Sequence, residues 1–350
     1  MKLILTSIAA TVVALALSVT SAFGQGGPTA PTTGGVVQTL QDTSVTIRAG
    51  RSQGSGTLFT RKLDGGDTVT FVWTAAHVVD GLKKTRSVID PDSGTPRLLV
   101  EFEDAEVVRE FTEEGRRIGE MKFNARVVRY SNASQGEDLA LLLIRRKNYV
   151  GENITTSFYL DEAIPPIGTE LYHVGSLLGQ VGSNSLTTGV VSQIGRVLDL
   201  GANGVIFDQT TVTAFPGSSG GGVFLKSDGR YVGMLVRGAG EQFNFTVPAR
   251  RLVGWAKKTG VEWAINPEVK LPSLDEISKI KVEDTGATFK AAAADRKPAH
   301  GDSDEEAYPF LIGQTPEAIA FEKGFAAGVI NNNQKPTPAG GSILRSLFTK

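Results

Sequence analysis

The sequence contains no cysteine, and this absence excludes several kinds of chemistry. Disulfide bonds, thiolate metal sites, a cysteine nucleophile and lipid attachment at an N-terminal cysteine all require that residue. Exported eukaryotic proteins of this size usually carry disulfides, so an exported chain without them is more typical of bacteria. The only histidines are His77, His173 and His300, which are too scattered to form a metal cluster. We therefore expect no metal site.

An excess of charge of either sign is also absent. The 36 lysines and arginines nearly balance the 37 aspartates and glutamates, for a net charge of −1. Nucleic acids and membrane surfaces attract strongly basic proteins, so neither is an expected partner. The length of 350 residues, with 40% hydrophobic and 21% charged residues, is that of a soluble globular protein with one large or two medium domains.

The N-terminus has the pattern of an export signal over residues 1–24. Lys2 precedes an apolar stretch that runs from Leu3 to Val19, and small residues follow before Gln25. An uncleaved membrane anchor is the alternative. The stretch is slightly short and is interrupted by serines and threonines, which favours cleavage. We expect an exported bacterial protein, periplasmic or secreted, with no stable membrane insertion after the signal is removed.

The central part of the chain alternates short β-branched and apolar runs with turn residues, a pattern that predicts antiparallel strands. The expected strands are residues 44–48, 56–60, 69–73, 98–102, 126–130, 139–144, 170–174, 189–194, 204–208, 221–225, 231–237 and 244–247. No long helical pattern separates them, so the sequence predicts an all-β fold of two packed antiparallel β-barrels. A short helix over residues 249–258, with Leu252 and Trp255 on its apolar face, is expected to close the barrel pair.

The segments that flank this region differ from it in composition. Residues 25–35 are rich in glycine, proline and threonine and are interpreted as a linker, so the folded domain is expected over 36–265. Residues 266–350 are interpreted as a mostly disordered tail with short helices, the first begun by a capping box at Ser273–Glu276. A later helix would align Phe321 and Phe325 on one stripe, which favours docking on a domain surface or a partner over binding a cofactor.

Ser219 is the first candidate for chemistry, in the glycine-rich segment 215–224. A serine hydroxyl attacks a carbonyl only when a base removes its proton and donors stabilise the resulting oxyanion. Gly217 permits a turn that points two N–H groups at one spot. The pattern also fits the nucleophile elbow of α/β-hydrolases, but that fold requires a histidine after the serine. Here only His300 follows, in the expected tail, so the elbow is disfavoured.

Two residues upstream of the serine are candidates for a base and an orienting acid. His77 lies where an apolar strand gives way to small residues, and Asp138 immediately precedes the apolar run 139–144. A histidine base needs an acid that fixes its tautomer and stabilises its charged form. Taken singly, each residue is also consistent with a structural role: a histidine packed beside a strand, or an aspartate in a turn.

These motifs together resemble a known family. Thr74-Ala-Ala-His77, Asp138-Leu-Ala-Leu141 and Gly217-Ser-Ser-Gly-Gly221, in that order, resemble the trypsin-like (chymotrypsin-fold) serine proteases, with the bacterial HtrA-like branch most similar. Five further segments are similar to that branch, namely residues 54–56, 174–179, 186–196, 233–238 and 245–248. The resemblance covers about residues 36–260. The remaining tail has no PDZ-like pattern, so the regulatory module usual in that branch is not expected.

The resemblance implies a serine endopeptidase that hydrolyses protein or peptide substrates through an acyl-enzyme intermediate. This mechanism needs no metal and no organic cofactor. By this resemblance Ser219 would attack the peptide carbonyl, His77 would accept its proton and Asp138 would orient the imidazole. The N–H groups of Gly217 and Ser219 would form the oxyanion hole. A catalytically silent peptide-binding module with the same fold is the alternative.

The resemblance also assigns a substrate pocket, made of Thr213, Ala214, Val236, Arg237 and Gly238. Members that cut after Lys or Arg place an acid six residues before the serine, where this sequence has Thr213. We therefore expect cleavage after small or medium apolar residues. The sequence departs from the family at Phe215, Gly222 and Arg237, the last at a position that is often tryptophan. These departures alter substrate contacts without removing a catalytic group.

Overall fold

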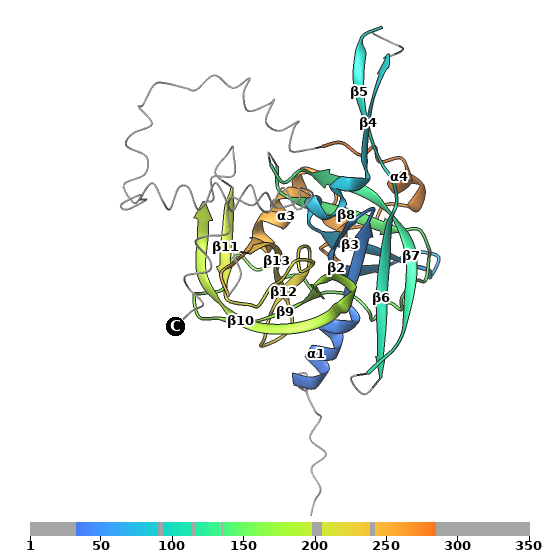
Figure 1. Cartoon of the computed structure of the whole chain (residues 1–350). Coiled ribbons are helices and arrows are strands. Elements are labelled where there is room, and N and C mark those ends of the chain that lie inside the picture. The colour runs from blue at the N-terminus through green and yellow to red at the C-terminus, as the bar shows by residue number, and fades with distance from the viewer. Residues whose placement is uncertain are drawn as a thin grey trace, which may run out of the picture.

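A computed structural model of the chain describes residues 33–284, apart from 90, 92–93, 114–115, 135, 198–204 and 239–241. The expected export signal and the stripe with Phe321 and Phe325 lie outside the described residues. The fold consists mainly of two closed antiparallel barrels that lie side by side (Figure 1). The all-β, two-barrel prediction is confirmed. No helix in the described part of the chain is long and apolar enough to cross a membrane.

The first barrel has the strand order β1-β2-β3-β8-β7-β6. Its strands are β1 (Ser44–Ala49), β2 (Ser52–Lys62), β3 (Thr68–Thr74), β6 (Ala105–Glu113), β7 (Arg116–Ser131) and β8 (Leu139–Ile144). β3 is buried at every residue because β2 and β8 pair with its two edges and later segments cover its outer face. Trp73 of β3 donates its indole N–H to the Ala264 carbonyl at 2.8 Å, which illustrates this cover.

The second barrel has the order β10-β11-β14-β13-β12-β9. Its strands are β9 (Glu170–Leu177), β10 (Gly182–Val197), β11 (Ile206–Thr210), β12 (Gly222–Leu225), β13 (Tyr231–Gly238) and β14 (Asn244–Pro248). Helix α3 (Ala249–Lys258) follows directly, with the bounds expected from sequence. Its Trp255 meets Trp73 edge to face, with ring centroids 5.9 Å apart. The helix therefore packs onto the first barrel and holds the two barrels together.

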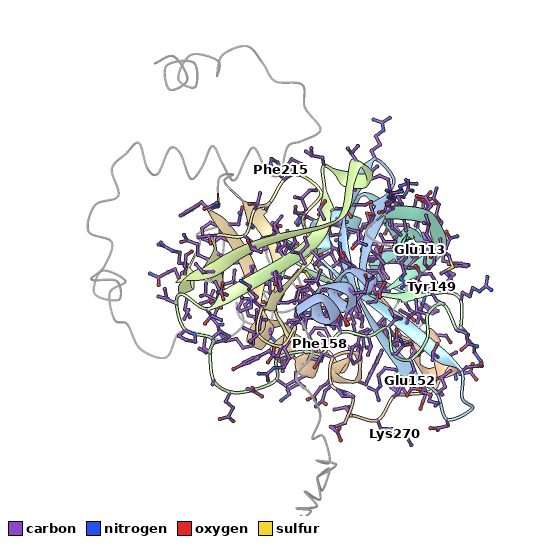
Figure 2. All side chains as sticks on the ribbon, turned by 90° about the horizontal axis from the view of Figure 1, so that it is seen from below. Glu113, Tyr149, Glu152, Phe158, Phe215 and Lys270 are labelled. Atoms are coloured by element: carbon purple, nitrogen blue, oxygen red, sulfur yellow. The ribbon has the colours of Figure 1, made fainter. Side chains whose placement is uncertain are left out.

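An aromatic cluster fills the space between the barrels. Phe158, in the segment that joins β8 to β9, lies inside the molecule (Figure 2) and is only 6% exposed. Its ring lies 5.5 Å from that of Phe59 in the first barrel and 4.8 Å from that of Tyr231 in the second. Aromatic pairs at these distances add to the free energy gained by burial. The two barrels are thus joined by a rigid aromatic contact.

The remaining elements connect or decorate the barrels. They are α1 (Thr33–Asp42), α2 (Ala76–Val79), η1 (Asp80–Leu82), β4 (Lys83–Ile89), β5 (Pro96–Phe102), η2 (Gly179–Val181), η3 (Glu262–Ala264) and α4 (Leu274–Ser278). The strand expected at 98–102 belongs to the β4–β5 hairpin, which projects from the first barrel (Figure 1). The expected linker is wrong over residues 33–35, which form the first turn of α1. Val36 and Leu40 stabilise this helix by packing into the core.

The domain boundary expected at residue 265 is placed too early. Residues 266–284, assigned from sequence to the tail, pack on the first barrel. Arg61 of β2 donates to the Asn266, Pro267 and Val269 carbonyls at 3.0 to 3.1 Å. Ile277 of α4 is fully buried in the main core. The capping box that begins α4 at Ser273 is confirmed. Apolar residues in this segment are separated by charges, so no local pattern marks them as core.

Candidate active site

His77 is held at the rim of the first barrel by the small residues before it. Ala75 and Ala76 are fully buried, which lets α2 pack tightly where β3 ends at Thr74. The backbone N–H of His77 donates to Asp138 Oδ1 at 3.1 Å. The imidazole keeps 30% of its side-chain surface exposed. The protein therefore fixes part of this residue, while part of the ring stays open to solvent.

Asp138 immediately precedes β8 and is 1% exposed. Its backbone has φ of 55°, a left-handed conformation that few non-glycine residues adopt. Both carboxylate oxygens lie 3.0 Å from His77 Nδ1. Because an ionised carboxylate can only accept hydrogen bonds, Nδ1 carries the proton and Nε2 remains an acceptor. The structure thus brings together His77 and Asp138, as the sequence predicted, with the tautomer that a general base requires.

The charges around this pair shift both pKa values. Burial lowers the pKa of His77, but the charge of Asp138 and the hydrogen bond to it raise the pKa more, to above its ordinary 6.5. Burial raises the pKa of Asp138, but His77 and then Arg237 outweigh this effect and bring the pKa below 3.8. Arg237 also opposes protonation of His77. Asp138 is therefore a fixed negative charge at neutral pH, and the imidazole is a stronger base than a free one.

The turn that carries Ser219 has its carbonyl groups bound on all sides. Pro216 O accepts from Leu178 N at 2.8 Å, and Gly217 O accepts from Ser55 Oγ at 2.7 Å. Ser218 O accepts from Gly221 N at 3.0 Å, and Ser219 O accepts from the Ser55 backbone N–H at 2.7 Å. Buried backbone groups are expected to be paired, so this pairing fixes the orientation of each peptide unit.

The N–H groups of the same turn behave differently. Within the described residues, neither Gly217 N nor Ser219 N donates a hydrogen bond, and the Ser219 hydroxyl has no hydrogen-bond partner, His77 included. Gly220 has φ of 86°, and a Cβ there would lie 2.2 Å from Ser55 O and 2.3 Å from Thr74 Oγ1. The serine turn therefore lies against the end of β3, which leads into His77. Two unengaged N–H donors and an unengaged hydroxyl share this turn.

His173, the second histidine, supports the turn from beneath. It is fully buried on β9, and its Nδ1 lies 3.0 Å from the Gly222 carbonyl. A Cβ at Gly221 would lie 2.6 Å from its ring. Burial lowers the pKa of His173 to about 4, so the ring is neutral at ordinary pH and Nδ1 donates. His173 lies on a strand, as the strand expected over residues 170–174 predicted, and its contacts there are structural.

The residues expected to form a substrate pocket divide into two groups. Val236 is buried, and Ala214 packs against the small core of the second barrel. The Thr213 carbonyl accepts from Thr187 Oγ1 at 3.0 Å. Gly238 ends β13 opposite Asn244. Arg237 instead extends toward the first barrel, while Val236 packs into the main core and Ala214 against the smaller one.

Arg237 is a buried guanidinium without an ion-pair partner among the described residues. It is 7% exposed, its Nη2 donates to the Ala133 carbonyl at 3.3 Å, and its Nε is buried with no partner in that part of the chain. Burial lowers the pKa of its guanidinium, whereas Asp138 raises it. The sequence pointed to Arg237 only as a departure in the pocket. Its proximity to the imidazole is a tertiary feature.

The sequence assigned no role to two residues that organise the serine turn. Ser55 Oγ accepts from Ser176 N at 2.7 Å. The same Oγ donates to the Gly217 carbonyl, and Ser55 N donates to the Ser219 carbonyl. Leu178 supplies the only donor to Pro216 O among the described residues. The motif Gly54-Ser-Gly56 was the available signal for Ser55, whereas nothing local marks Leu178.

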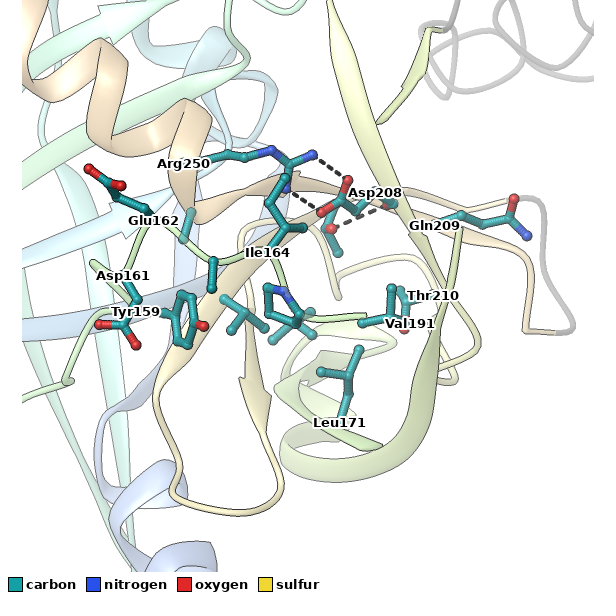
Figure 3. A pocket seen from close by; sticks show the side chains of 16 residues that line it. Tyr159, Asp161, Glu162, Ile164, Leu171, Val191, Asp208, Gln209, Thr210 and Arg250 are labelled. Atoms are coloured by element: carbon teal, nitrogen blue, oxygen red, sulfur yellow. Dashed lines mark hydrogen bonds and ion pairs between the residues drawn. The ribbon is translucent and has the colours of Figure 1, made fainter. Parts of the chain in front are cut away.

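A separate pocket lies at one end of the second barrel (Figure 3) and contains none of these residues. Its floor is apolar, with Leu171, Val191 and Val223, and its rim holds Asp208 bound by Arg250 through two hydrogen bonds of 2.6 and 2.7 Å. In the described part of the chain no cluster of histidine and acidic residues is suited to hold a metal ion.

Comparison with known proteins supplies one family. A model of the trypsin-like peptidase domain matches residues 54–234. Three solved structures are similar, each over 66% of this chain. The serine endoprotease from Yersinia pestis is 18% identical over 67% of its chain, with a TM-score of 0.45. Deg5 is 20% identical over 94% of its chain, with a TM-score of 0.44. An inactive mutant of Rv3671c from M. tuberculosis is 18% identical over 93% of its chain, with a TM-score of 0.45. No curated protein matches the sequence.

Proposed function

The chain belongs to the family of trypsin-like peptidase domains, and on that premise we propose that it is an exported serine endopeptidase. One observation carries the proposal. His77 is bound through Nδ1 to a buried Asp138, and beside it lies a serine turn whose carbonyls are all engaged while the N–H groups of Gly217 and Ser219 are not. A histidine general base needs the Nε2 acceptor that the bond to Asp138 leaves available, and an oxyanion hole needs unengaged N–H donors.

In the proposed reaction, Ser219 Oγ attacks the carbonyl carbon of a peptide bond and its proton passes to His77 Nε2. The carbonyl oxygen becomes an oxyanion, which accepts hydrogen bonds from Gly217 N and Ser219 N. His77 then gives its proton to the leaving amine, and an ester on Ser219 remains. Water, deprotonated by His77, hydrolyses that ester and regenerates the hydroxyl. Asp138 stays ionised throughout and stabilises the imidazolium.

The substrate would bind as an extended chain along β13. β12 pairs with β13 only as far as Met234, and Leu235 bonds to Gly220 and Gly221. Beyond that point, residues 236–238 have no described strand on this edge, so a peptide can add there. Thr213, six residues before Ser219, carries no charge, so we expect a small or medium apolar residue before the cleaved bond in place of Lys or Arg. A peptide-library profile dominated by Lys or Arg would contradict this preference.

Labelling with a fluorophosphonate probe tests the function. The probe phosphonylates a serine that has been activated by a base, and we expect labelling of the wild-type protein that is lost in Ser219→Ala. Labelling that persists in Ser219→Ala would assign the reaction to another serine. Failure of every form to label would favour a peptide-binding module, in line with the absence of a hydrogen bond between His77 and Ser219 noted above.

Export and the tail belong to the same proposal. The apolar segment after Lys2 would direct the protein to the periplasm or the medium, where unstructured polypeptides are available as substrates. The stripe with Phe321 and Phe325 would serve partner docking. Fractionation of cells that express the full chain, with mass determination of the mature N-terminus, tests export. Retention of the full-length chain in the cytoplasm would contradict it.

A further inference from the structure

The turn between β9 and β10 controls the carbonyl next to the proposed oxyanion hole. Leu178 N donates to Pro216 O at 2.8 Å, which turns the 216–217 peptide so that the Gly217 N–H points away from that carbonyl. Gly217 has φ of 96°, and a Cβ there would lie 2.6 Å from Gly179 N. The oxyanion segment and the turn at 178–181 are therefore in direct contact, so a displacement of the turn would displace the Gly217 N–H.

The turn cannot be held in place by apolar packing. Leu178 is 59% exposed and Val181 is 91% exposed, so neither side chain is buried against a core. Leu178 also has φ of 59°, a left-handed conformation that is unfavourable for a branched residue. Something other than hydrophobic burial must stabilise it.

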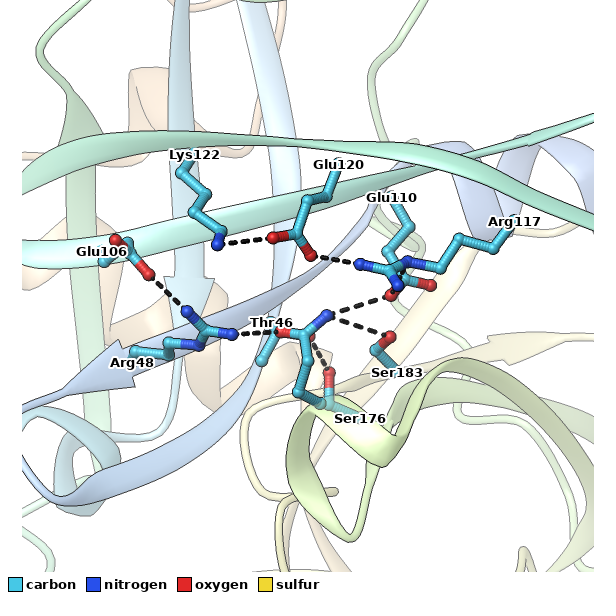
Figure 4. A network of polar contacts seen from close by, with 10 residues as sticks. Thr46, Arg48, Glu106, Glu110, Arg117, Glu120, Lys122, Ser176 and Ser183 are labelled. Carbon is cyan, nitrogen blue, oxygen red and sulfur yellow. Dashed lines mark hydrogen bonds and ion pairs between the residues drawn. The ribbon is translucent and has the colours of Figure 1, made fainter.

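Polar contacts from Gln180 supply that stabilisation, and Figure 4 shows Arg48 and Glu110 in the network that they join. Its side-chain amide accepts from Arg48 Nη2 at 3.1 Å and donates to Glu110 Oε1 at 3.0 Å. Its backbone N–H donates to Gln53 Oε1 at 3.1 Å. Arg48, Gln53 and Glu110 all belong to the first barrel. Gln180 therefore ties the turn of the second barrel to strands β1, β2 and β6 of the first.

We propose that Gln180 is a positioning residue for the oxyanion hole. Its amide binds Arg48 and Glu110 and so holds the turn at 178–181 in place, and this turn orients the 216–217 peptide through Leu178. The inference rests on the proposed function, because it gives a role to the Gly217 N–H. Gln180 does not touch the reacting atoms. It acts through Leu178 and Gly179, and its loss weakens transition-state stabilisation more than substrate binding.

Gln180→Leu is a suitable test because it leaves no partner charge unpaired. Arg48 keeps Glu106 at 2.8 Å, and Glu110 keeps Arg117 at 2.9 Å. Loss of one oxyanion-hole donor typically lowers turnover about 100- to 1000-fold. Since Gln180→Leu loosens that donor without deleting it, we expect kcat on a peptide ester to fall by roughly tenfold to 100-fold with KM little changed. The rate of fluorophosphonate labelling should fall in parallel, because the phosphonyl oxygen occupies the same hole.

Gln41→Leu is the matched control. Gln41 of α1 donates its side-chain amide to the Asn184 carbonyl at 3.0 Å, on the same hairpin but beyond the turn. Its loss should leave kcat and the labelling rate unchanged. An equal loss in Gln41→Leu would show that any weakening of the hairpin matters and would overturn the specific role of Gln180.

Gln180→Glu covers the case in which Gln180→Leu does not fold. It keeps the contact to Arg48 but replaces the donor to Glu110 with a carboxylate that repels it, so a reduced kcat at unchanged KM is again expected. If the probe labels the wild-type protein and labels the Gln180 variants at the same rate, this inference is overturned and the proposed function stands. A change in KM alone in these variants has the same meaning. Absence of labelling in the wild-type protein would overturn both.

Discussion

Arg237 of the second barrel donates a hydrogen bond of 3.3 Å to the Ala133 carbonyl of the first, in the loop that leads to Asp138. The bond joins the two barrels and accompanies a buried positive charge that acts on the His77–Asp138 pair. That charge opposes protonation of His77 and favours ionisation of Asp138. A residue that from sequence belongs to the substrate pocket thus affects the proton affinity of the proposed base.

Replacing Arg237 with methionine should move the acid limit of activity to higher pH. His77 accepts a proton only when neutral, so kcat/KM falls as pH drops through its pKa. Removal of a nearby positive charge favours the imidazolium and raises that pKa, so activity is lost at a higher pH than in the wild type. The pH profile of kcat/KM measures this. Arg237→Lys keeps the charge and should keep the profile; an unshifted Arg237→Met profile would show that the charge has no influence.

Asp138→Asn should abolish most of the turnover without unfolding the protein. The amide can present an N–H to His77 Nδ1, which favours the wrong tautomer and leaves Nε2 protonated. A loss on the order of 10⁴-fold in kcat is expected at neutral pH. Asp80→Asn is the control, since Asp80 acts on His77 only as a more distant charge, and it should remain active. A fully active Asp138→Asn enzyme would rule out the proposed mechanism.

Gly220→Ala should destabilise the serine turn and impair activity. The added Cβ would lie 2.2 Å from the Ser55 carbonyl, and alanine would have to adopt φ of 86°. Strain of this kind costs about 1–3 kcal/mol, which denaturant unfolding measures. Gly65→Ala is the control, because nothing lies within 4 Å of a Cβ there. Equal stability of the two variants would mean that the turn relaxes freely.

Ile277→Ala should lower the free energy of unfolding by about 2–5 kcal/mol, the usual cost of a large-to-small change in a core. The prediction follows from the full burial of Ile277 in α4. Ile118→Ala, at a position that is 63% exposed, should have little effect.

Truncation after residue 265 should lower the free energy of unfolding by more than Ile277→Ala does, whereas truncation after residue 284 should leave every described contact intact. A protein that ends at residue 265 and is as stable as the full chain would show that the folded domain ends there, as the sequence analysis expected.

Stability should decrease in mild acid partly through His173. Its pKa is about 4 in the folded protein and 6.5 as an ordinary value. Below pH 6.5 the unfolded chain takes up a proton that the folded protein does not. The part of the free energy of unfolding that depends on neutral His173 is therefore fully present above pH 6.5. It is lost as the pH falls toward 4, by at most about 1.4 kcal/mol per pH unit. Urea unfolding at several pH values should show this component in the wild type and not in His173→Gln.

The sequence by itself determined most of the strands, the closing helix and the order of His77, Asp138 and Ser219. Strand formation depends on alternation between neighbouring residues, so most barrel strands and the bounds of α3 could be predicted. Family motifs are local too, and the segments around His77 and Ser219 carry enough glycine and alanine to be recognised. β4, β6 and α1 were missed because their residues are mixed in polarity and reach stability through pairing or packing with distant segments.

Only the tertiary structure decided how the serine turn is supported and where the domain ends. Ser55 meets Gly217 across 162 residues of sequence, Gln180 meets Glu110 across 70, and Arg61 meets Asn266 across 205. No pattern within one segment encodes such contacts, since each is a single polar or apolar side chain that gains its partner only when the barrels close. The charge of Arg237 is visible in the sequence, but its effect on His77 depends on burial and distance, and only the fold sets these two quantities.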